Sequence, residues 1–346
     1  MTKLNVFLAS LMVIGLMTGC GGSTGGGGKA TGKSEITMTL KSDGEEVEIT
    51  INGKGTAVID WGDGSPVESV EFDESSEDYA HTYSKDAEYT VKITGENVTE
   101  LALNRVILTT LDVSKNPALQ VLTCYSSRLK SLDVSKNPAL TKLHVFDADL
   151  TTLDISKNTA LKDFLCNRNL LTNLDVSNNT ALEILHCADN KFASIDISKN
   201  TALKELGCSG NKIATLDMSK NTALKEVSCE LNMLSTLDVS KNSALEKLQC
   251  NSNKLTSIDI SKNPELKVAV FMDNELTNVV LGDNPKLTTV YLQKNQFSAQ
   301  TLNALLESLH ANEVKDKKVI IYNNPGTDSC NANIATKKGW NVVSTY

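Results

Sequence analysis

Cysteine is the residue type best suited to disulfide or metal chemistry in this sequence, and its spacing is regular. Six of the 8 cysteines recur at multiples of 21 residues: Cys124, Cys166, Cys187, Cys208, Cys229 and Cys250. If each copy contributes one parallel strand, neighbouring thiols lie about 4.8 Å apart and aim the same way, which is poor geometry for a disulfide. Val145, Phe271 and Leu292 fill the same column. We expect buried, reduced thiols, with disulfides or a metal site as the alternatives.

Carboxylates and histidines could supply acid–base chemistry. One aspartate recurs in each copy: Asp112, Asp133, Asp154, Asp175, Asp196, Asp217, Asp238 and Asp259. Paired carboxylates hydrolyse glycosides, but a regular row beside lysines such as Lys136 and Lys199 is more typical of solvated turns. His144 and His186 lie two copies apart, roughly 10 Å by strand spacing, without a third partner, and His81 has no nucleophile beside it. We predict no catalytic residue, no metal and no cofactor.

These residues belong to a repeated unit, of which Asp196 to Leu216 (DISKNTALKELGCSGNKIATL) is one copy. A leucine recurs every 21 residues from Leu119 to Leu287, and a second apolar column runs from Leu122 to Val290. A short period sustained over about nine copies is the signature of a solenoid, in which each unit stacks on its neighbours.

The repeat pattern L-x-x-L-x-C-x-x-N-x-L-x-x-L-D-V-S-K-N resembles the leucine-rich-repeat family, close to the 21-residue kind of Bacteroidota surface proteins. The resemblance covers about Leu101 to Phe297. It implies a mainly β fold: a curved, right-handed solenoid with a parallel β-sheet on its concave face. We assign residues 97–297 to this solenoid.

Two asparagine columns are predicted to be structural. The first is Asn169, Asn190, Asn211, Asn232, Asn253, Asn274 and Asn295. An inward amide at a turn can donate to and accept from backbone groups of adjacent copies that would otherwise be buried without partners. Ser127 and Ala148 interrupt this column, so we expect the first copies to be looser. The second column, Asn116 through Asn284, is expected to act similarly on the other side.

The strand positions that alternate with the core vary from copy to copy while the scaffold does not, as a modular binding surface requires. The first four copies place an aromatic and histidine patch on this face. We predict that it binds a ligand through Tyr125, His144, Phe146, Leu165, Asn167 and His186. Unselected surface variation is the alternative interpretation.

The N-terminus predicts export. Residues 1–19 have an early cation, an apolar run and a small-residue end, as a secretory signal does. The sequence Leu16-Met17-Thr18-Gly19-Cys20 resembles a bacterial lipobox, which implies that Cys20 is lipidated. Residues 20–33 then form a glycine- and serine-rich tether. We expect an exported protein, lipid-anchored to the outer membrane on its cell-surface or periplasmic side.

Residues 34–96 predict a small all-β module. Apolar and polar residues alternate in Ile36-Met38-Leu40 and Tyr89-Val91-Ile93, which is the strand signal. The run Ile59-Asp60-Trp61-Gly62-Asp63-Gly64, followed by His81-Thr82-Tyr83, resembles the PKD family and implies an immunoglobulin-like β-sandwich. The acidic stretch 68–78 could bind Ca²⁺, but a solvated loop is favoured because the alternating acidic spacing of a calcium loop is absent.

Residues 298–346 are predicted to be an α/β cap. Ser298 can N-cap a helix that carries Leu302, Leu305 and Leu306 at helical spacing. A strand over 319–322, a turn and a short helix over 333–338 follow. Trp340 would cover the last copy.

The sequence therefore predicts a non-enzymatic, lipid-anchored binding or adhesion protein that recognises a host or envelope protein with its concave face. A glycan-binding surface lipoprotein and a purely structural envelope protein are the alternatives. The formal charge of −8 and the absence of a basic block argue against nucleic acid as a partner. The membrane is expected to be contacted through the lipid only, and we expect a monomer.

Overall fold

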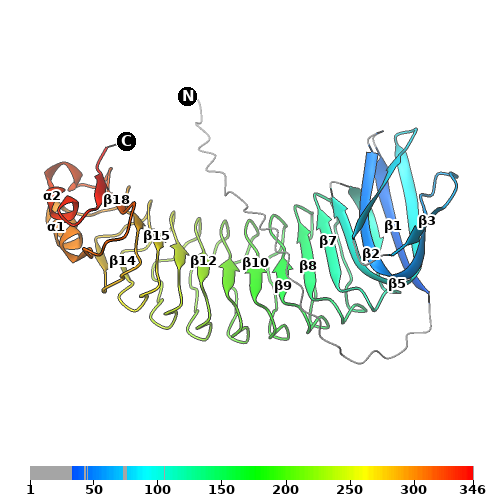
Figure 1. Cartoon of the computed structure of the whole chain (residues 1–346), viewed down its shortest axis with the longest axis horizontal. Coiled ribbons are helices and arrows are strands. Elements are labelled where there is room, and N and C mark those ends of the chain that lie inside the picture. Colours follow the sequence, from blue (N-terminus) through cyan, green and yellow to red (C-terminus); the bar gives the residue numbers. More distant parts are fainter. Residues whose placement is uncertain (1–32, 43, 45, 73–75, 105, 346) are drawn as a thin grey trace. The chain divides into compact units, whose positions relative to one another are not determined.

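The computed structural model describes residues 33–346, except 43, 45, 73–75, 105 and 346 (Figure 1). The predicted signal, the lipobox with Cys20 and nearly all of the tether lie outside these residues. The chain from Lys33 to Tyr346 forms one compact unit.

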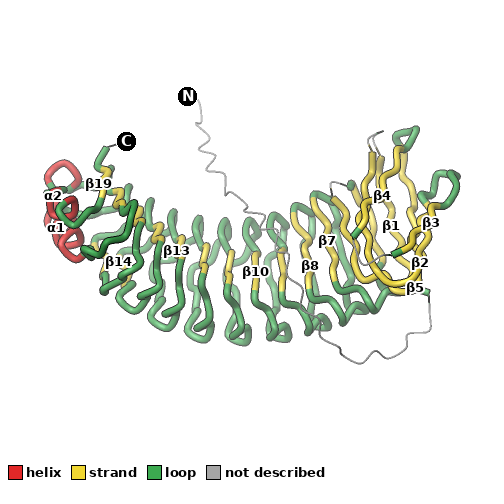
Figure 2. The backbone as a smooth tube through the Cα atoms, in the orientation of Figure 1, coloured by secondary structure: helices red, strands yellow, loops and turns green. Residues whose placement is uncertain are grey.

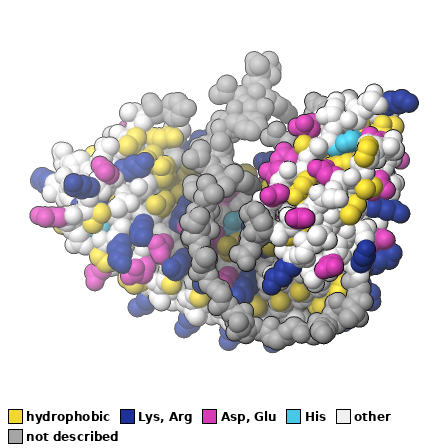
Figure 3. Space-filling view, turned by 45° about the vertical axis from the view of Figure 1, so that its right-hand side comes forward, with side chains coloured by type: hydrophobic (Ala, Val, Ile, Leu, Met, Phe, Trp, Pro, Cys, Tyr) yellow, Lys and Arg dark blue, Asp and Glu magenta, His cyan; other side chains and the backbone are white. Residues whose placement is uncertain are grey.

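The N-terminal module is antiparallel. Its strands are β1 (Ser34–Ser42), β2 (Glu46–Asp60), β3 (Glu68–Glu71), β4 (Glu77–Thr82), β5 (Ala87–Asn104) and β6 (Ile107–Asp112). β1 pairs with β5 and β6, while β2 pairs with β3, β4 and β5. Alternate side chains such as Ile36, Met38 and Leu40 are fully buried, as the sequence predicted. In the space-filling view, acidic side chains are spread over the visible surface of this module (Figure 3).

β5 joins the module to the solenoid. Its first nine residues pair with β1, and its last five pair in parallel with β7 (Val121–Tyr125), beginning with Glu100 opposite Val121. The domain boundary expected at 96/97 therefore falls inside one continuous strand. The module and the solenoid share a 17-stranded sheet.

The solenoid contributes one short strand per coil, all parallel and in register at intervals of one repeat (Figures 1 and 2). After β7 these strands are β8 (Lys142–Phe146), β9 (Asp163–Leu165), β10 (Ile184–His186), β11 (Glu205–Gly207), β12 (Glu226–Ser228), β13 (Lys247–Gln249), β15 (Val268–Val270) and β17 (Thr289–Tyr291). A second sheet pairs β14 (Ser257–Asp259) with β16 (Asn278–Val280). The parallel solenoid predicted from the 21-residue period is confirmed.

The first asparagine column satisfies backbone groups as predicted. The side-chain nitrogen of Asn211 donates to the carbonyls of Cys187, Cys208 and Ser209 at 3.0–3.1 Å, and its oxygen accepts from the Phe192 amide at 3.0 Å. In the second column, the Asn221 nitrogen donates to two carbonyls of the preceding coil. Its oxygen accepts no hydrogen bond from the described residues, so only the donor half of that prediction is confirmed.

Ser127 and Ala148 interrupt the asparagine column in the first coils, and the expectation that these coils are looser stays a prediction. The parallel ladder is nevertheless longest there. β7 and β8 have five residues each, whereas the later solenoid strands have three. The physical reason is that β7 pairs along its whole length with the long strand β5, which extends the ladder into β8.

The C-terminal segment continues the sheet and then covers it. It contains α1 (Ala299–Ser308), β18 (Lys318–Ile320), the 3₁₀ helix η1 (Thr327–Ser329), α2 (Asn333–Thr336) and β19 (Asn341–Val343). β18 pairs with β17, and β19 pairs with β18. The Ser298 hydroxyl accepts a hydrogen bond from the Thr301 amide, which confirms the predicted N-cap. Trp340 is buried, and its indole nitrogen donates to the His310 carbonyl at 2.8 Å.

The column cysteines are free thiols. Cys124, Cys166, Cys187, Cys208, Cys229 and Cys250 are fully buried among the leucines. Burial disfavours the thiolate and raises the pKa of the Cys124 thiol to about 12. Since the thiolate is the reactive form, these groups are protected from oxidation while the solenoid is folded.

A thiol titration tests this arrangement. In denatured but unreduced protein, every cysteine other than Cys20 is expected to react with a thiol reagent, whereas the six column thiols should be silent in the native protein. A disulfide between column residues would lower the denatured count by two and contradict the arrangement.

Candidate functional site

An aromatic pair lies on the outer face of the sheet at its N-terminal end. Tyr125 at the end of β7 and Phe146 at the end of β8 are direct neighbours in register. Their ring centroids are 3.9 Å apart with the planes inclined by 36°. Both side chains are half-buried, so part of each remains accessible to solvent. The pair is held on two hydrogen-bonded strands and is therefore preorganised.

His144 connects this pair to a carboxylate. It is buried on β8, with its Nδ1 3.4 Å from the Tyr125 hydroxyl and its Nε2 2.9 Å from a carboxylate oxygen of Asp163. The Lys142 ammonium lies 3.8 Å from the other Asp163 oxygen. Burial raises the pKa of Tyr125 above its usual value, so its hydroxyl stays protonated at neutral pH. Asp163 was not in the predicted site, although the strand alternation places it on the same face.

Leu165 and Asn167 occupy the next coil. Leu165 lies in register between His144 and His186 and is half-buried. The Asn167 side-chain oxygen accepts a hydrogen bond from the Ala188 amide at 2.8 Å. Asn167 therefore bridges two coils, and its oxygen is already used. The structure brings Tyr125, His144 and Phe146 together and sets Leu165 beside them.

His186 is positioned by a glycine. A Cβ atom added to Gly207 would lie 3.0 Å from the imidazole Cδ2, so the missing side chain makes room for the ring. The imidazole Nε2 is 3.8 Å from a Glu205 carboxylate oxygen. Burial lowers the pKa of His186 below its ordinary 6.5, and nearby Asp163 and Glu226 oppose that shift. The ring is neutral at pH 7.

A proton NMR titration checks this assignment. The His186 imidazole is expected to titrate below pH 6.5, and E226Q should lower the midpoint further because it removes a stabilising carboxylate. Between the lowered pKa and 6.5 the unfolded chain binds a proton that the folded chain does not, so the His186 contribution to stability falls as pH falls. The urea-unfolded protein is the reference, and a folded midpoint at or above it would contradict the assignment.

The aspartate column forms turns, as predicted. The Asp217 carboxylate accepts a hydrogen bond from the Ser219 amide at 2.8 Å, and the same bond recurs along the column. These hydrogen bonds, more than the adjacent lysines, hold the pKa of each column carboxyl below its usual range.

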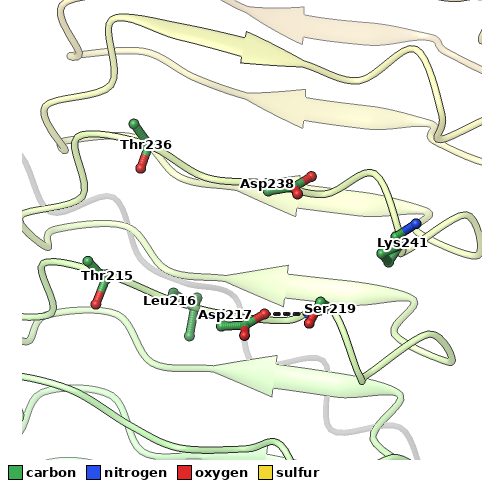
Figure 4. Close-up of a pocket in the computed structure, with 7 residues that line it drawn as sticks. All are labelled: Thr215, Leu216, Asp217, Ser219, Thr236, Asp238 and Lys241. Carbon is green, nitrogen blue, oxygen red and sulfur yellow. Dashed lines mark hydrogen bonds between the residues drawn. The ribbon is translucent and has the colours of Figure 1, made fainter.

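A pocket of ≈ 250 Å³ opens between two coils on this side of the solenoid. It is lined by Thr215, Leu216, Asp217, Ser219, Thr236, Asp238 and Lys241 (Figure 4). Its carboxylates already accept backbone hydrogen bonds, and equivalent groups recur in other coils. We therefore favour the sheet face as the functional site.

His81 lies in a packed polar cluster of the module. Its ring stacks on Trp61 at 4.9 Å, and its Nε2 is 2.8 Å from an Asp63 oxygen. Within the described parts of the chain, no three histidine, cysteine, aspartate or glutamate residues are grouped to hold a metal. Residues 73–75 of the acidic stretch lie outside those parts.

None of the helices within the described residues has the length and apolar character needed to cross a membrane.

Comparisons with known proteins identify the class of fold. No protein-family model matches the chain, and no curated protein matches it. Solved structures do match: the fold is the mainly β, parallel solenoid of leucine-rich-repeat proteins, including bacterial ones.

Among these, the functional domain of InlJ from Listeria monocytogenes, which includes a cysteine ladder, is 30% identical with a TM-score of 0.64. The match covers 71% of this chain and 53% of that one, so this chain spans about half the length of the InlJ structure.

Two further solved structures share the fold at lower identity. The leucine-rich-repeat protein LIC12759 from Leptospira interrogans is 19% identical, covers 69% of each chain and has a TM-score of 0.57. The ectodomain of the Arabidopsis thaliana receptor kinase GASSHO1/SCHENGEN3, in complex with CASPARIAN STRIP INTEGRITY FACTOR 2, is 20% identical with a TM-score of 0.51. That match covers 67% of this chain and 33% of the receptor.

Proposed function

We propose that this chain is a non-enzymatic, exported binding protein that recognises a protein ligand with the outer face of its parallel sheet. The observation that carries the proposal is the aromatic pair Tyr125–Phe146, which is partly exposed on two paired strands of the sheet with His144 and Leu165 beside it. Aromatic anchors held in place before binding supply much of the energy of protein interfaces at low entropic cost. The plant receptor complex is a precedent for ligand binding by this fold.

The anchoring is proposed from the sequence. Cys20 would carry the lipid, residues 20–33 would act as a tether, and the β1–β6 module would be a PKD-like, immunoglobulin-like spacer of residues 34–96. The protein would face the cell surface or the periplasm from the outer membrane. Replacing Cys20 by serine should abolish incorporation of labelled palmitate. Label retained in this variant would contradict lipidation at Cys20.

A glycan ligand is the second candidate, because tyrosine and phenylalanine rings can stack on sugars. The packing of the two rings disfavours it. At 3.9 Å between centroids, each ring covers one face of the other, which removes half of the ring faces on which a sugar could stack.

The test uses the full chain in detergent, screened against arrays of purified extracellular-matrix proteins, envelope proteins and polysaccharides. For a protein that is bound, the Y125A/F146A variant should lower affinity by about 30-fold or more, corresponding to a hot spot of about 2 kcal/mol. Tyr291→Ala, at the far end of the same face, is the matched control.

If Y125A/F146A is folded by circular dichroism and binds with unchanged affinity, the ligand binds to another surface of the protein. Binding to polysaccharides only would favour the glycan candidate.

A further inference from the structure

The sheet face changes character beyond the aromatic patch. In the coils of β10, β11 and β12 the outward positions include the small residues Ala188, Gly207, Ser209 and Ser228 and the carboxylates Glu205, Glu226 and Glu230, before Lys247 and Gln249 follow on β13. Glu205 on β11 and Glu226 on β12 are direct partners in register, so their backbones lie about 4.8 Å apart. We call Glu205, Glu226 and Glu230 the acidic segment. Like charges directly opposite each other destabilise a sheet.

The acidic segment lacks cations of its own. Glu226 and Glu230 form no ion pair within the described residues, and the partner of Glu205 is the neutral His186. Lys247 follows Glu226 in register on β13 but makes no ion pair with it there. One Glu230 carboxylate oxygen is buried without a hydrogen-bond partner among the described residues. Burial, and then the charges of Glu226 and Asp163, raise the pKa of Glu205.

The same coils do pair their other acids. Glu183 binds Lys204 of the next coil at 2.5 Å, and Glu246 binds Lys267 at 2.5 Å. Coil-to-coil lysine partners are therefore available in this repeat and are used one position away from the sheet face. The carboxylates of the acidic segment lie on the outward face of the sheet and have no lysine partner within the described parts of the chain.

Resting on the proposed function, we propose that the acidic segment binds an arginine or lysine side chain of the same protein ligand whose apolar residue contacts Tyr125 and Phe146. Charge complementarity identifies the occupant: a cation between Glu205 and Glu226 removes the repulsion between these two carboxylates. Arginine fits best because its planar fork can bond two carboxylates at once. The small residues leave space for the side chain to approach.

The strand spacing fixes where this cation lies on the ligand. Phe146 on β8 is three strands from Glu205 and four from Glu226, or about 14 Å and 19 Å across the sheet at about 4.8 Å per strand. It also lies four residues, about 13 Å, farther along the strand direction than these glutamates, so the direct backbone distances are about 19 Å and 23 Å. An extended peptide advances about 3.3 Å per residue. The basic residue therefore lies about six to seven positions from the apolar anchor, in a segment that runs obliquely across the strands.

Synthetic peptides test the proposal with the full chain in detergent, by fluorescence anisotropy. The probes are extended peptides with one tryptophan and an arginine about six or seven positions away, and matched peptides with alanine or glutamate instead of arginine. We expect the arginine peptides to bind at least about tenfold more tightly than the alanine peptides, the glutamate peptides to bind most weakly, and the arginine advantage to shrink with added salt.

The decisive variant is E226Q/E230Q. It keeps side-chain size, removes like charge and is expected to fold with unchanged or slightly higher stability, so loss of binding cannot be ascribed to unfolding. It should abolish the arginine advantage and leave binding of the alanine peptides unchanged. E183Q/E246Q, which removes two acids that are paired with lysine, is the matched control and should preserve the advantage.

The outcomes separate this proposal from the previous one. An arginine advantage that survives E226Q/E230Q overturns the cation site, even if Y125A/F146A weakens every peptide. An arginine advantage that E226Q/E230Q removes, with no effect of Y125A/F146A, keeps the cation site and overturns the aromatic patch. Equal binding of all peptides, or no binding at millimolar concentration, overturns the cation site, as does a preference for acidic polysaccharides.

Discussion

Replacing Asn211 by alanine is expected to lower the free energy of unfolding by about 3–5 kcal/mol, because several buried backbone groups lose a partner at about 1–3 kcal/mol each. The groups are the carbonyls of Cys187, Cys208 and Ser209 and the amide of Phe192. The loss exceeds that of an ordinary surface substitution since one side chain serves two adjacent coils. Urea denaturation followed by circular dichroism measures it.

Lys212→Ala, at the exposed position that follows Asn211, is the control and should change the free energy by less than about 0.5 kcal/mol. Because coils of a solenoid can unfold separately, hydrogen exchange should accompany the denaturation curve. We expect the Phe192 amide to lose protection in the asparagine variant. A loss below about 1 kcal/mol would show that water replaces the side chain without penalty.

The second large effect is expected from Gly326→Ala in the cap. An added Cβ would lie 2.0 Å from the Ala299 nitrogen and 2.1 Å from the Ser298 carbonyl carbon, distances that require backbone movement. Ser298 is the N-cap of α1, and α1 buries Leu302, Leu305 and Leu306 against the last coils. The methyl group is therefore expected to displace α1 and to cost about 3 kcal/mol or more, at the upper end of effects from overpacking.

Gly339→Ala is the matched control. Its Cβ would have ordinary contacts of 3.5 Å to Lys317, and its φ of +79° should cost only about 1–2 kcal/mol. The cap variant should also increase tryptophan fluorescence quenching by acrylamide, since Trp340 is buried in the cap. If Gly326→Ala is no less stable than Gly339→Ala, α1 does not depend on this close approach.

Most of the solenoid could be predicted from the sequence because its 21-residue period recurs over many copies and each core position keeps the same type of residue. A repeated pattern of leucine, cysteine and asparagine fixes which side chains point inward, and the structure confirms it at Leu206, Cys208 and Asn211. The continuity of β5 could not be predicted. Its buried residues shift register between Ile93, Val98 and Leu101, because the β2–β5 pairing contains two irregularities, and the alternation is lost there.

The candidate site was predictable as a face but not as a set of contacts. Strand alternation places Tyr125, His144 and Phe146 outward, and the structure brings them together. The contact between His144 and Asp163 and the hydrogen bond that occupies Asn167 depend on side-chain orientation, which the repeat pattern does not specify. The room that Gly207 leaves for His186 depends equally on the coil before it.

Each coil of the solenoid pairs only with its two neighbours, so the gene can gain or lose whole repeats without disturbing the ends of the array. Gain or loss of one 21-residue unit between β9 and β15 changes the number of strands without touching β5 or α1, which terminate the array. Unequal recombination between near-identical repeats can therefore produce array-length variants that fold. Such variants would change the distance across the sheet between the aromatic pair and the acidic segment in steps of about 4.8 Å. They would therefore bind ligands in which the apolar and basic residues are differently spaced.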